Sequence, residues 1–215
     1  MSLAMLDWSG VKKHYNHRLE IHRELKRLYK AKQTGPFINL LLGISDEAGN
    51  YSSAEHKLGP KILGSNLNAH RQILSLAKSF MIVSGTDVPR LIRQANISYL
   101  GIGVGSEISC MLRPTRCWVA NTRSTWAYLL RKHGYDYDTA EEELNLYRQG
   151  DETSEMAYEK WTALHSLLEQ DMAKLAAEGT RIGRQAGIKP GRRLYLWADA
   201  IASALYMGRE AFMGR

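Results

Sequence analysis

The sequence predicts a mainly α-helical, multi-helix globular protein, and three observations support this fold class. Apolar residues recur at three- and four-residue spacings along most of the 215-residue chain. Serine, threonine or aspartate precedes several of these segments, and glycine or proline follows them, as at helix ends. The composition, 44% hydrophobic and 24% charged, is typical of a packed protein. Only residues 37–44 and 97–120 leave room for one or two short strands.

We interpret residues 1–215 as a single domain, because a chain of this length can enclose one sizeable core. Its predicted sub-regions are an amphipathic basic helix at 9–33, a central helical unit at 66–134 and carboxy-terminal helices at 138–213, which include a basic glycine-rich linker at 179–193.

The first predicted helix extends from about Val11 to Lys32, with an apolar stripe on one side and lysines and arginines on the other. A glycine-proline pair then ends it. The apolar run at 37–44 suits either a buried strand or a short buried helix. Ser52 and Glu55 have the spacing of a capping box, which predicts a short helix that stops at Gly59 and Pro60.

Seven further segments have helical patterns. They are 66–81, 87–95, 106–112, 124–133, 138–150, 151–177 and 192–213. The last segment is apolar on nearly every side, so we expect either the other helices or a second subunit to bury it. A homo-oligomer through the carboxy-terminal helices is therefore one predicted partnership.

The glycine-rich stretch at 97–109 is the first candidate functional surface. Residues 107–112 read Glu-Ile-Ser-Cys-Met-Leu and resemble the second half of helix-turn-helix DNA-binding motifs, in which such a run forms the recognition helix. The preceding turn, 96–105, is longer than that pattern. The resemblance implies base contacts from one end of this helix and phosphate contacts from the turn after it. The implied residues are Ser106, Glu107, Ser109 and Cys110 for bases, and Arg113 and Arg116 for phosphates.

The same stretch has two other interpretations. Gly101, Gly103, Gly105 and Ser106 could form a phosphate-binding loop whose backbone N–H groups and following helix hold an anion. The spacing misses the Rossmann fingerprint by one residue, and the lysine of a P-loop is missing. Alternatively, the glycines simply allow two helices to pack closely. In this stretch Ser106 is also the predicted cap of the helix that follows the glycines.

Positive charge provides the second candidate surface. The chain has 29 Lys and Arg against 22 Asp and Glu, a formal net charge of +7, which favours anionic partners. The segment 179–193 is basic, rich in glycine and free of acids. It predicts a polyanion-binding loop, although a solvated loop with nothing bound has the same composition. Its candidate nucleic-acid-binding residues are Arg181, Arg184, Lys189, Arg192 and Arg193.

Several classes of protein do not fit the sequence. Cys110 and Cys117 are the only cysteines and imply neither a disulfide framework nor a structural zinc site, so we predict no metal and no cofactor. The most apolar stretch, 194–208, is too short to span a membrane and contains Asp199. The amino terminus lacks a signal-peptide pattern. These features predict a cytoplasmic protein without a membrane partner.

The resulting hypothesis is a non-catalytic, regulatory nucleic-acid-binding protein that contacts the phosphates of DNA or RNA through its basic loops. One alternative is a small enzyme or ligand-binding protein that recognises a phosphorylated molecule at Gly101–Ser106. The other alternative is a helical scaffold or assembly protein. The sequence assigns no catalytic residue.

Overall fold

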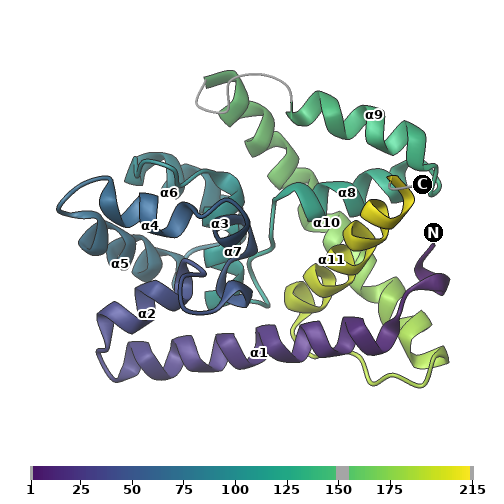
Figure 1. The fold of residues 1–215 in the computed structure, drawn as a ribbon, viewed down its shortest axis with the longest axis horizontal. Helices are drawn as coiled ribbons and strands as arrows, with labels where there is room; N and C mark the ends of the chain where they lie inside the picture. Colours follow the sequence, from purple (N-terminus) through teal and green to yellow (C-terminus); the bar gives the residue numbers. More distant parts are fainter. Residues whose placement is uncertain (1, 149–154, 214–215) are drawn as a thin grey trace. The chain divides into compact units, whose positions relative to one another are not determined.

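The computed structural model describes residues 2–148 and 155–213. Its α-helices are α1 (Trp8–Lys30), α2 (Thr34–Leu41), α3 (Tyr51–Glu55), α4 (Leu58–Gly64), α5 (Ala69–Phe80), α6 (Val88–Ala95), α7 (Ile102–Leu112), α8 (Thr122–Lys132), α9 (Tyr137–Arg148), α10 (Glu155–Gln185) and α11 (Leu194–Met213) (Figure 1). Short 3-10 turns occur at Leu3–Met5, Glu47–Gly49 and Gly85–Asp87. The predicted mainly α fold is confirmed, and neither 37–44 nor 97–120 contains a strand.

The chain divides into two compact units. Unit 1 comprises Met1–Tyr15 and Thr122–Arg215, and unit 2 comprises Asn16–Asn121. The boundary after Asn121 falls inside the predicted 66–134 region, and the single domain inferred from sequence stays a prediction. The reason is long-range packing: α7 packs against α3, α5 and α6, whereas α8 packs against α9, α10 and α11.

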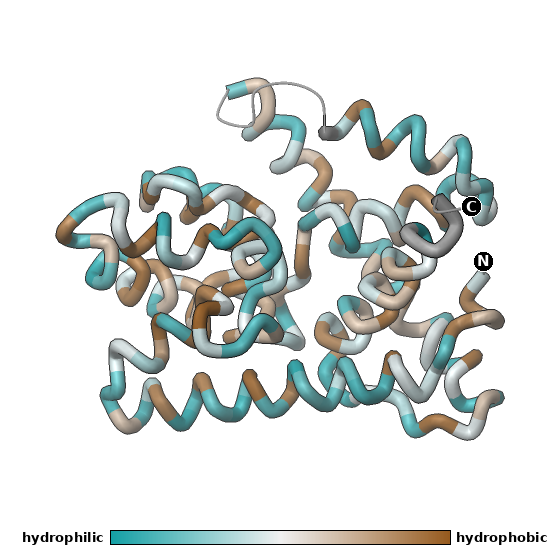
Figure 2. The backbone as a smooth tube through the Cα atoms, viewed as in Figure 1, coloured by the Kyte–Doolittle hydropathy of each residue, from teal (hydrophilic) through white to brown (hydrophobic). Residues whose placement is uncertain are grey.

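Helix α7 is the central helix of unit 2, because 10 of its 11 residues are buried. Around it, α1 contributes buried residues such as Leu25, and the start of α2 contributes Phe37 and Ile38. The run 37–44, for which a strand was one alternative, is therefore mainly helix. Figure 2 shows hydrophobic segments recurring between hydrophilic ones along α1, as the predicted amphipathic pattern requires.

The predicted capping box at Ser52 and Glu55 is wrong. Asn50 caps α3 instead, since its side-chain oxygen accepts a hydrogen bond from the backbone N–H of Ser53 at 3.0 Å. The predicted stop at Gly59 and Pro60 is also wrong, because both lie in the first turn of α4. Proline is tolerated there because the N–H that it lacks would have no partner within the helix.

In unit 1, the neighbouring helices bury α11. Its contacts are mainly with α8 and α10, and Leu196, Trp197, Ile201 and Leu205 are each at most 1% exposed. The apolar surface that suggested an oligomer is thus used within unit 1.

Helix α10 continues past its predicted end at Ala177, through Gly179 and Gly183, to Gln185. These glycines serve packing rather than helix termination. A Cβ atom on Gly179 would lie 2.3 Å from Ile201, and one on Gly183 would lie 3.2 Å from the Trp8 ring. The loop that follows is therefore shorter than predicted, at 186–193. The predicted boundary between helices at 150 and 151 lies outside the described residues.

Candidate nucleic-acid interface

The glycine-rich stretch is helical from Ile102 onward. Gly101 is the N-cap residue of α7, and the backbone N–H of Gly105 donates to the carbonyl of Gly101 at 2.9 Å. Ser106 therefore lies inside the helix rather than at its start, so the predicted cap at this residue is wrong. A Cβ atom on Gly105 would lie 2.4 Å from Ile92 of α6. The absence of a side chain allows these two helices to approach, as in the close-packing interpretation.

The two predicted base-reading serines are both fully buried. The Ser109 hydroxyl donates to the carbonyl of Ser106 at 2.8 Å, and the Ser106 hydroxyl accepts from the backbone N–H of Ala120 at 2.9 Å. Cys110 is buried as well. Because base readout requires side chains that reach into a groove, this face of α7 does not present the chemistry that the helix-turn-helix resemblance implies.

Glu107 is also fully buried, together with Arg18 of α1. Its Oε1 accepts from Arg18 Nη1 at 3.0 Å and from the backbone N–H of Tyr51 at 2.9 Å, while Oε2 accepts from Ser52 N at 2.8 Å. Arg18 Nη1 also donates to the carbonyl of Ala48 at 2.7 Å. The carboxylate therefore joins α1, α3 and α7, and its burial gives it a structural role.

The two arginines after α7 differ in availability. Arg113 is half-buried and its Nη1 donates to the carbonyl of Val83 at 2.9 Å, which ties the turn to the segment that follows α5. Arg116 is exposed. The turn itself is held by a backbone bond from Arg116 N to Arg113 O at 2.9 Å. Arg116 is thus the residue of this pair that a phosphate reaches more readily.

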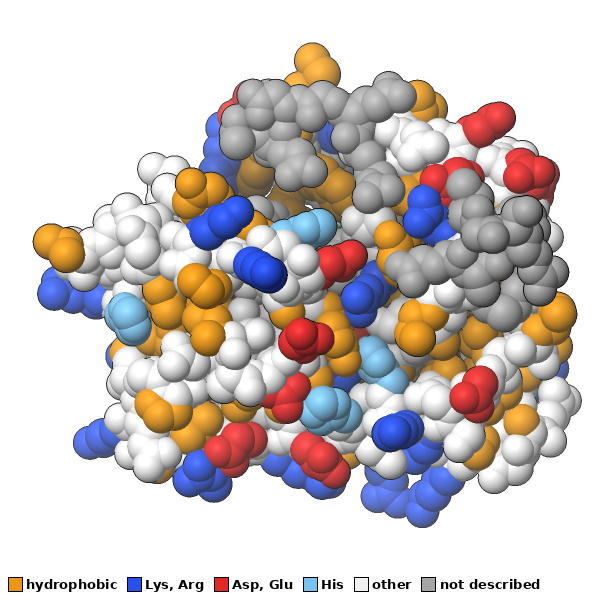
Figure 3. Space-filling view, in the orientation of Figure 1, with side chains coloured by type: hydrophobic (Ala, Val, Ile, Leu, Met, Phe, Trp, Pro, Cys, Tyr) orange, Lys and Arg blue, Asp and Glu red, His pale blue; other side chains and the backbone are white. Residues whose placement is uncertain are grey.

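The five basic residues predicted between 179 and 193 belong to unit 1 and all have exposed side chains. Arg181 and Arg184 lie on the last turns of α10, and the other three lie in the loop 186–193. Figure 3 shows Lys and Arg side chains gathered at the lower edge of the view, where Figure 1 places this loop.

Tyr15 of α1 holds the end of this loop in place. Its hydroxyl accepts hydrogen bonds from the backbone N–H groups of Arg192 and Arg193, at 2.9 and 3.2 Å. A Cβ atom on Gly191 would lie 2.5 Å from the Tyr15 ring, so glycine permits the close approach. The loop therefore has a defined course around the first turns of α1, which sequence reasoning did not detect.

Two lysines of α1 extend this group of positive charges. Lys13 is exposed. Burial lowers the pKa of Lys12, and the positive charge of nearby Lys189 lowers it further. We name Lys12, Lys13, Arg181, Arg184, Lys189, Arg192 and Arg193 the basic cluster.

The cluster is a local feature of unit 1. By sequence, unit 1 contains 15 Lys and Arg and 15 Asp and Glu, whereas unit 2 contains 14 and 7. Unit 1 is thus neutral overall, yet no acid occurs in the chain between Glu178 and Asp199. Unit 1 therefore has no excess of positive charge, but part of its positive charge is concentrated in one segment without acids.

Within residues 2–148 and 155–213, no three or more His, Cys, Asp or Glu side chains are grouped so that they could hold a metal ion. In the same residues, no helix combines the length and the apolarity that crossing a membrane requires. Comparisons with protein-family models, curated proteins and solved structures found no match.

Proposed function

We propose that the protein binds nucleic acid without catalysing a reaction, and that the basic cluster contacts the phosphate backbone. The observation that carries the proposal is the segregation of these cations in a unit that has no net charge. Exposed lysines and arginines that neutralise phosphates release condensed counterions, which supplies most of the free energy of non-specific binding.

The structure of the loop supports this role. The hydrogen bonds that the Tyr15 hydroxyl accepts and the packing of Gly191 hold the backbone of Arg192 and Arg193 before any ligand arrives. A loop that is ordered in advance loses less conformational entropy on binding. Burial is the main cause of the lowered pKa of Lys12, and repulsion from Lys189 adds to it; a polyanion would relieve the part that comes from repulsion.

The proposed contacts are to phosphates and carry no sequence readout. Ser106 and Ser109 have no part in them because they are buried. In unit 2, exposed Arg116 offers a further phosphate contact. Duplex and single-stranded DNA or RNA are therefore all expected ligands, with affinities governed by salt rather than by base sequence.

The test is fluorescence anisotropy with labelled duplex and single-stranded oligonucleotides across a range of salt concentrations. The variant is Lys189→Ala/Arg192→Ala/Arg193→Ala. If all three side chains contact duplex phosphates, the variant should reduce the slope of log K against log salt by about 2.7. The parent protein would then lose about 40-fold more affinity than the variant between about 50 and about 200 mM salt.

A matched control removes the same charge elsewhere. Lys61→Ala/Arg71→Ala/Lys174→Ala changes three exposed cations outside the basic cluster and should retain nearly the parental slope. If the parent protein binds neither duplex nor single strand at low salt, or if the two triple variants weaken binding equally, the basic cluster is not a nucleic-acid interface.

A further inference from the structure

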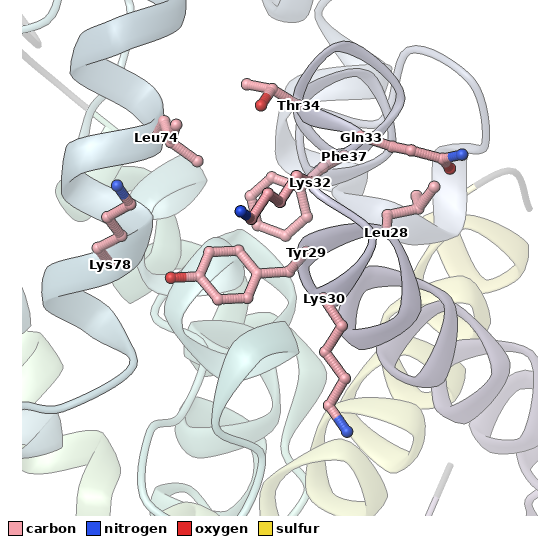
Figure 4. A pocket seen from close by; sticks show the side chains of 9 residues that line it. All are labelled: Leu28, Tyr29, Lys30, Lys32, Gln33, Thr34, Phe37, Leu74 and Lys78. Carbon is pink, nitrogen blue, oxygen red and sulfur yellow. The ribbon is translucent and has the colours of Figure 1, made fainter.

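Unit 2 contains a pocket of about 500 Å³ between the turn that joins α1 to α2 and the side of α5. This volume lies within the range of about 300–1,000 Å³ that is usual for small-molecule sites. Leu28, Phe37 and Leu74 supply apolar walls, and Tyr29, Lys32 and Lys78 supply polar groups (Figure 4).

An aromatic pair lines one side of the pocket. The Tyr29 and Phe37 rings have centroids 5.7 Å apart and planes inclined at 51°. Phe37 is 1% exposed and anchors the pair in the core, whereas Tyr29 is 36% exposed. A Tyr ring that is supported from behind and open in front provides a surface on which a planar ring can stack.

The charge of the pocket is positive. Three lysines and no acid are among its nine lining residues. In Figure 4 the side chain of Lys32 points toward the space beside the Tyr29 ring, Lys78 lies along α5 on the other side of this space, and Lys30 points away. A planar, anionic ligand would thus meet the ring and both ammonium groups.

The position of Lys32 is set by the backbone. This residue has a left-handed φ of 54° at the end of α1. Its N–H donates to the carbonyl of Tyr29 at 3.1 Å, and the N–H of Gln33 donates to the carbonyl of Leu28 at 3.0 Å. Such bonds end a helix in a tight turn. The turn directs Lys32 back toward the ring of Tyr29, three residues earlier in the chain.

We propose that this pocket binds a nucleoside monophosphate group, with the base stacked on Tyr29 and the phosphate bound by Lys32 and Lys78. The source of the group is either a free nucleotide or the phosphorylated end of a nucleic-acid strand, since both have the same chemistry. The site lies in unit 2, and its argument does not use the basic cluster of unit 1.

The combination of groups selects this ligand class. Two lysines on the border of one pocket, Lys32 from the turn after α1 and Lys78 from α5, suit a phosphate, which accepts several charge-assisted hydrogen bonds. The open face of Tyr29 suits a flat heterocycle. Inorganic phosphate would leave the ring unused, and a nucleoside without phosphate would leave the ammonium groups unpaired, so each fragment should bind more weakly than the whole.

The test uses the full chain and isothermal titration calorimetry with AMP, adenosine and inorganic phosphate as probes. We expect AMP to bind at least about 10-fold more tightly than either fragment, because only AMP contacts both the Tyr29 ring and the two lysines. Lys32→Ala/Lys78→Ala should weaken AMP more than about 10-fold and leave adenosine nearly unchanged. Tyr29→Leu should weaken both AMP and adenosine by about 5-fold or more.

Two controls separate this site from general positive charge and from the basic cluster. Lys30→Ala removes a lysine that borders the pocket but points away, and it should change AMP affinity less than about 2-fold. Lys189→Ala/Arg192→Ala/Arg193→Ala should bind AMP as the parent does. Failure of oligonucleotide binding in that variant, with AMP binding intact, would distinguish the two proposals.

Competition identifies the source of the group. If a 5′-phosphorylated oligonucleotide displaces AMP and its 5′-hydroxyl counterpart does not, a strand end can occupy the pocket. If neither displaces AMP, the ligand is a free nucleotide. Absence of AMP binding at millimolar concentration, or AMP affinity that is unchanged in Lys32→Ala/Lys78→Ala, would overturn the proposal.

Discussion

Replacement of Glu107 by glutamine should strongly destabilise unit 2. The wild-type carboxylate is fully buried and accepts three hydrogen bonds, from Arg18, Tyr51 and Ser52. Glutamine has nearly the same shape, but one of its two terminal atoms is an amide nitrogen that donates rather than accepts. In either orientation of the amide, its NH2 group faces an N–H group of the protein, and two donors cannot form a hydrogen bond.

The magnitude follows from these contacts. Glutamine also removes the negative charge that compensates the buried guanidinium of Arg18. Removal of one partner of a buried ion pair typically costs about 3–5 kcal/mol. Since whole domains are stable by about 5–15 kcal/mol, we expect Glu107→Gln to remove a large share of the free energy of unfolding of unit 2.

The assay combines urea unfolding with amide hydrogen exchange. Urea unfolding measures the free energy of unfolding, and exchange at the N–H groups of Tyr51 and Ser52 reports the local bonds to the carboxylate. Both amides should exchange faster in Glu107→Gln than in the parent protein. Arg18→Met should also destabilise, and the double variant Arg18→Met/Glu107→Gln should lose less stability than the sum of the single variants, because the two residues interact.

A surface carboxylate provides the control. Glu24 pairs with Arg27 one helical turn away, and both side chains are substantially exposed, so Glu24→Gln should leave the free energy of unfolding unchanged within error. If Glu107→Gln costs less than about 1 kcal/mol, or if the two amides keep their protection, the pair does not hold α1, α3 and α7 together in the way described.

Three further predictions concern buried residues. Burial lowers the pKa of His165 from 6.5 to about 4. Between about pH 4 and pH 6.5, His165 is therefore protonated in the unfolded state and neutral in the folded state. Urea unfolding should therefore show about 2 kcal/mol less stability at pH 5 than at pH 7, a loss that His165→Phe should largely remove. Gly105→Ala, whose Cβ would meet Ile92 at 2.4 Å, should cost about 1–3 kcal/mol and lower the melting temperature, and adding Ile92→Val should recover part of the loss. Burial raises the pKa of the Cys117 thiol, so a thiol reagent at pH 8 should label it far more slowly in the folded protein than in urea.

Local sequence signals predicted much of the fold. Helix α6, which matches the predicted segment 87–95, shows why: Pro89 lies near its start, and Asn96 ends it in the left-handed conformation, and both residue types favour these positions. The amphipathic stripe of α1 and the apolar residues of α11 were likewise visible, because helical spacing encodes which side is buried. The exposed basic residues of 179–193 were also identified from sequence alone, since runs of charge avoid the core.

Contacts between residues that are distant in the sequence determined the roles of the glycines of 101–105 and of Glu107, which local signals did not predict. The glycines of 101–105 suggested a loop, yet they belong to the start of a helix whose close neighbour, Ile92, lies in another segment. From sequence, Glu107 was assigned to base contacts through the resemblance to helix-turn-helix motifs. Its role depends on Arg18, which is 89 residues away in the chain.

The sequence by itself determined the helical class, most helix positions and the presence of a basic segment. All of these depend on residue type and spacing within a few turns. Only the tertiary structure decided that the chain packs as two units, that Tyr15 holds the basic loop, and that Tyr29, Lys32 and Lys78 border one pocket. These features arise from side chains that meet across long separations, and helical periodicity contains no information about which helix will be the neighbour.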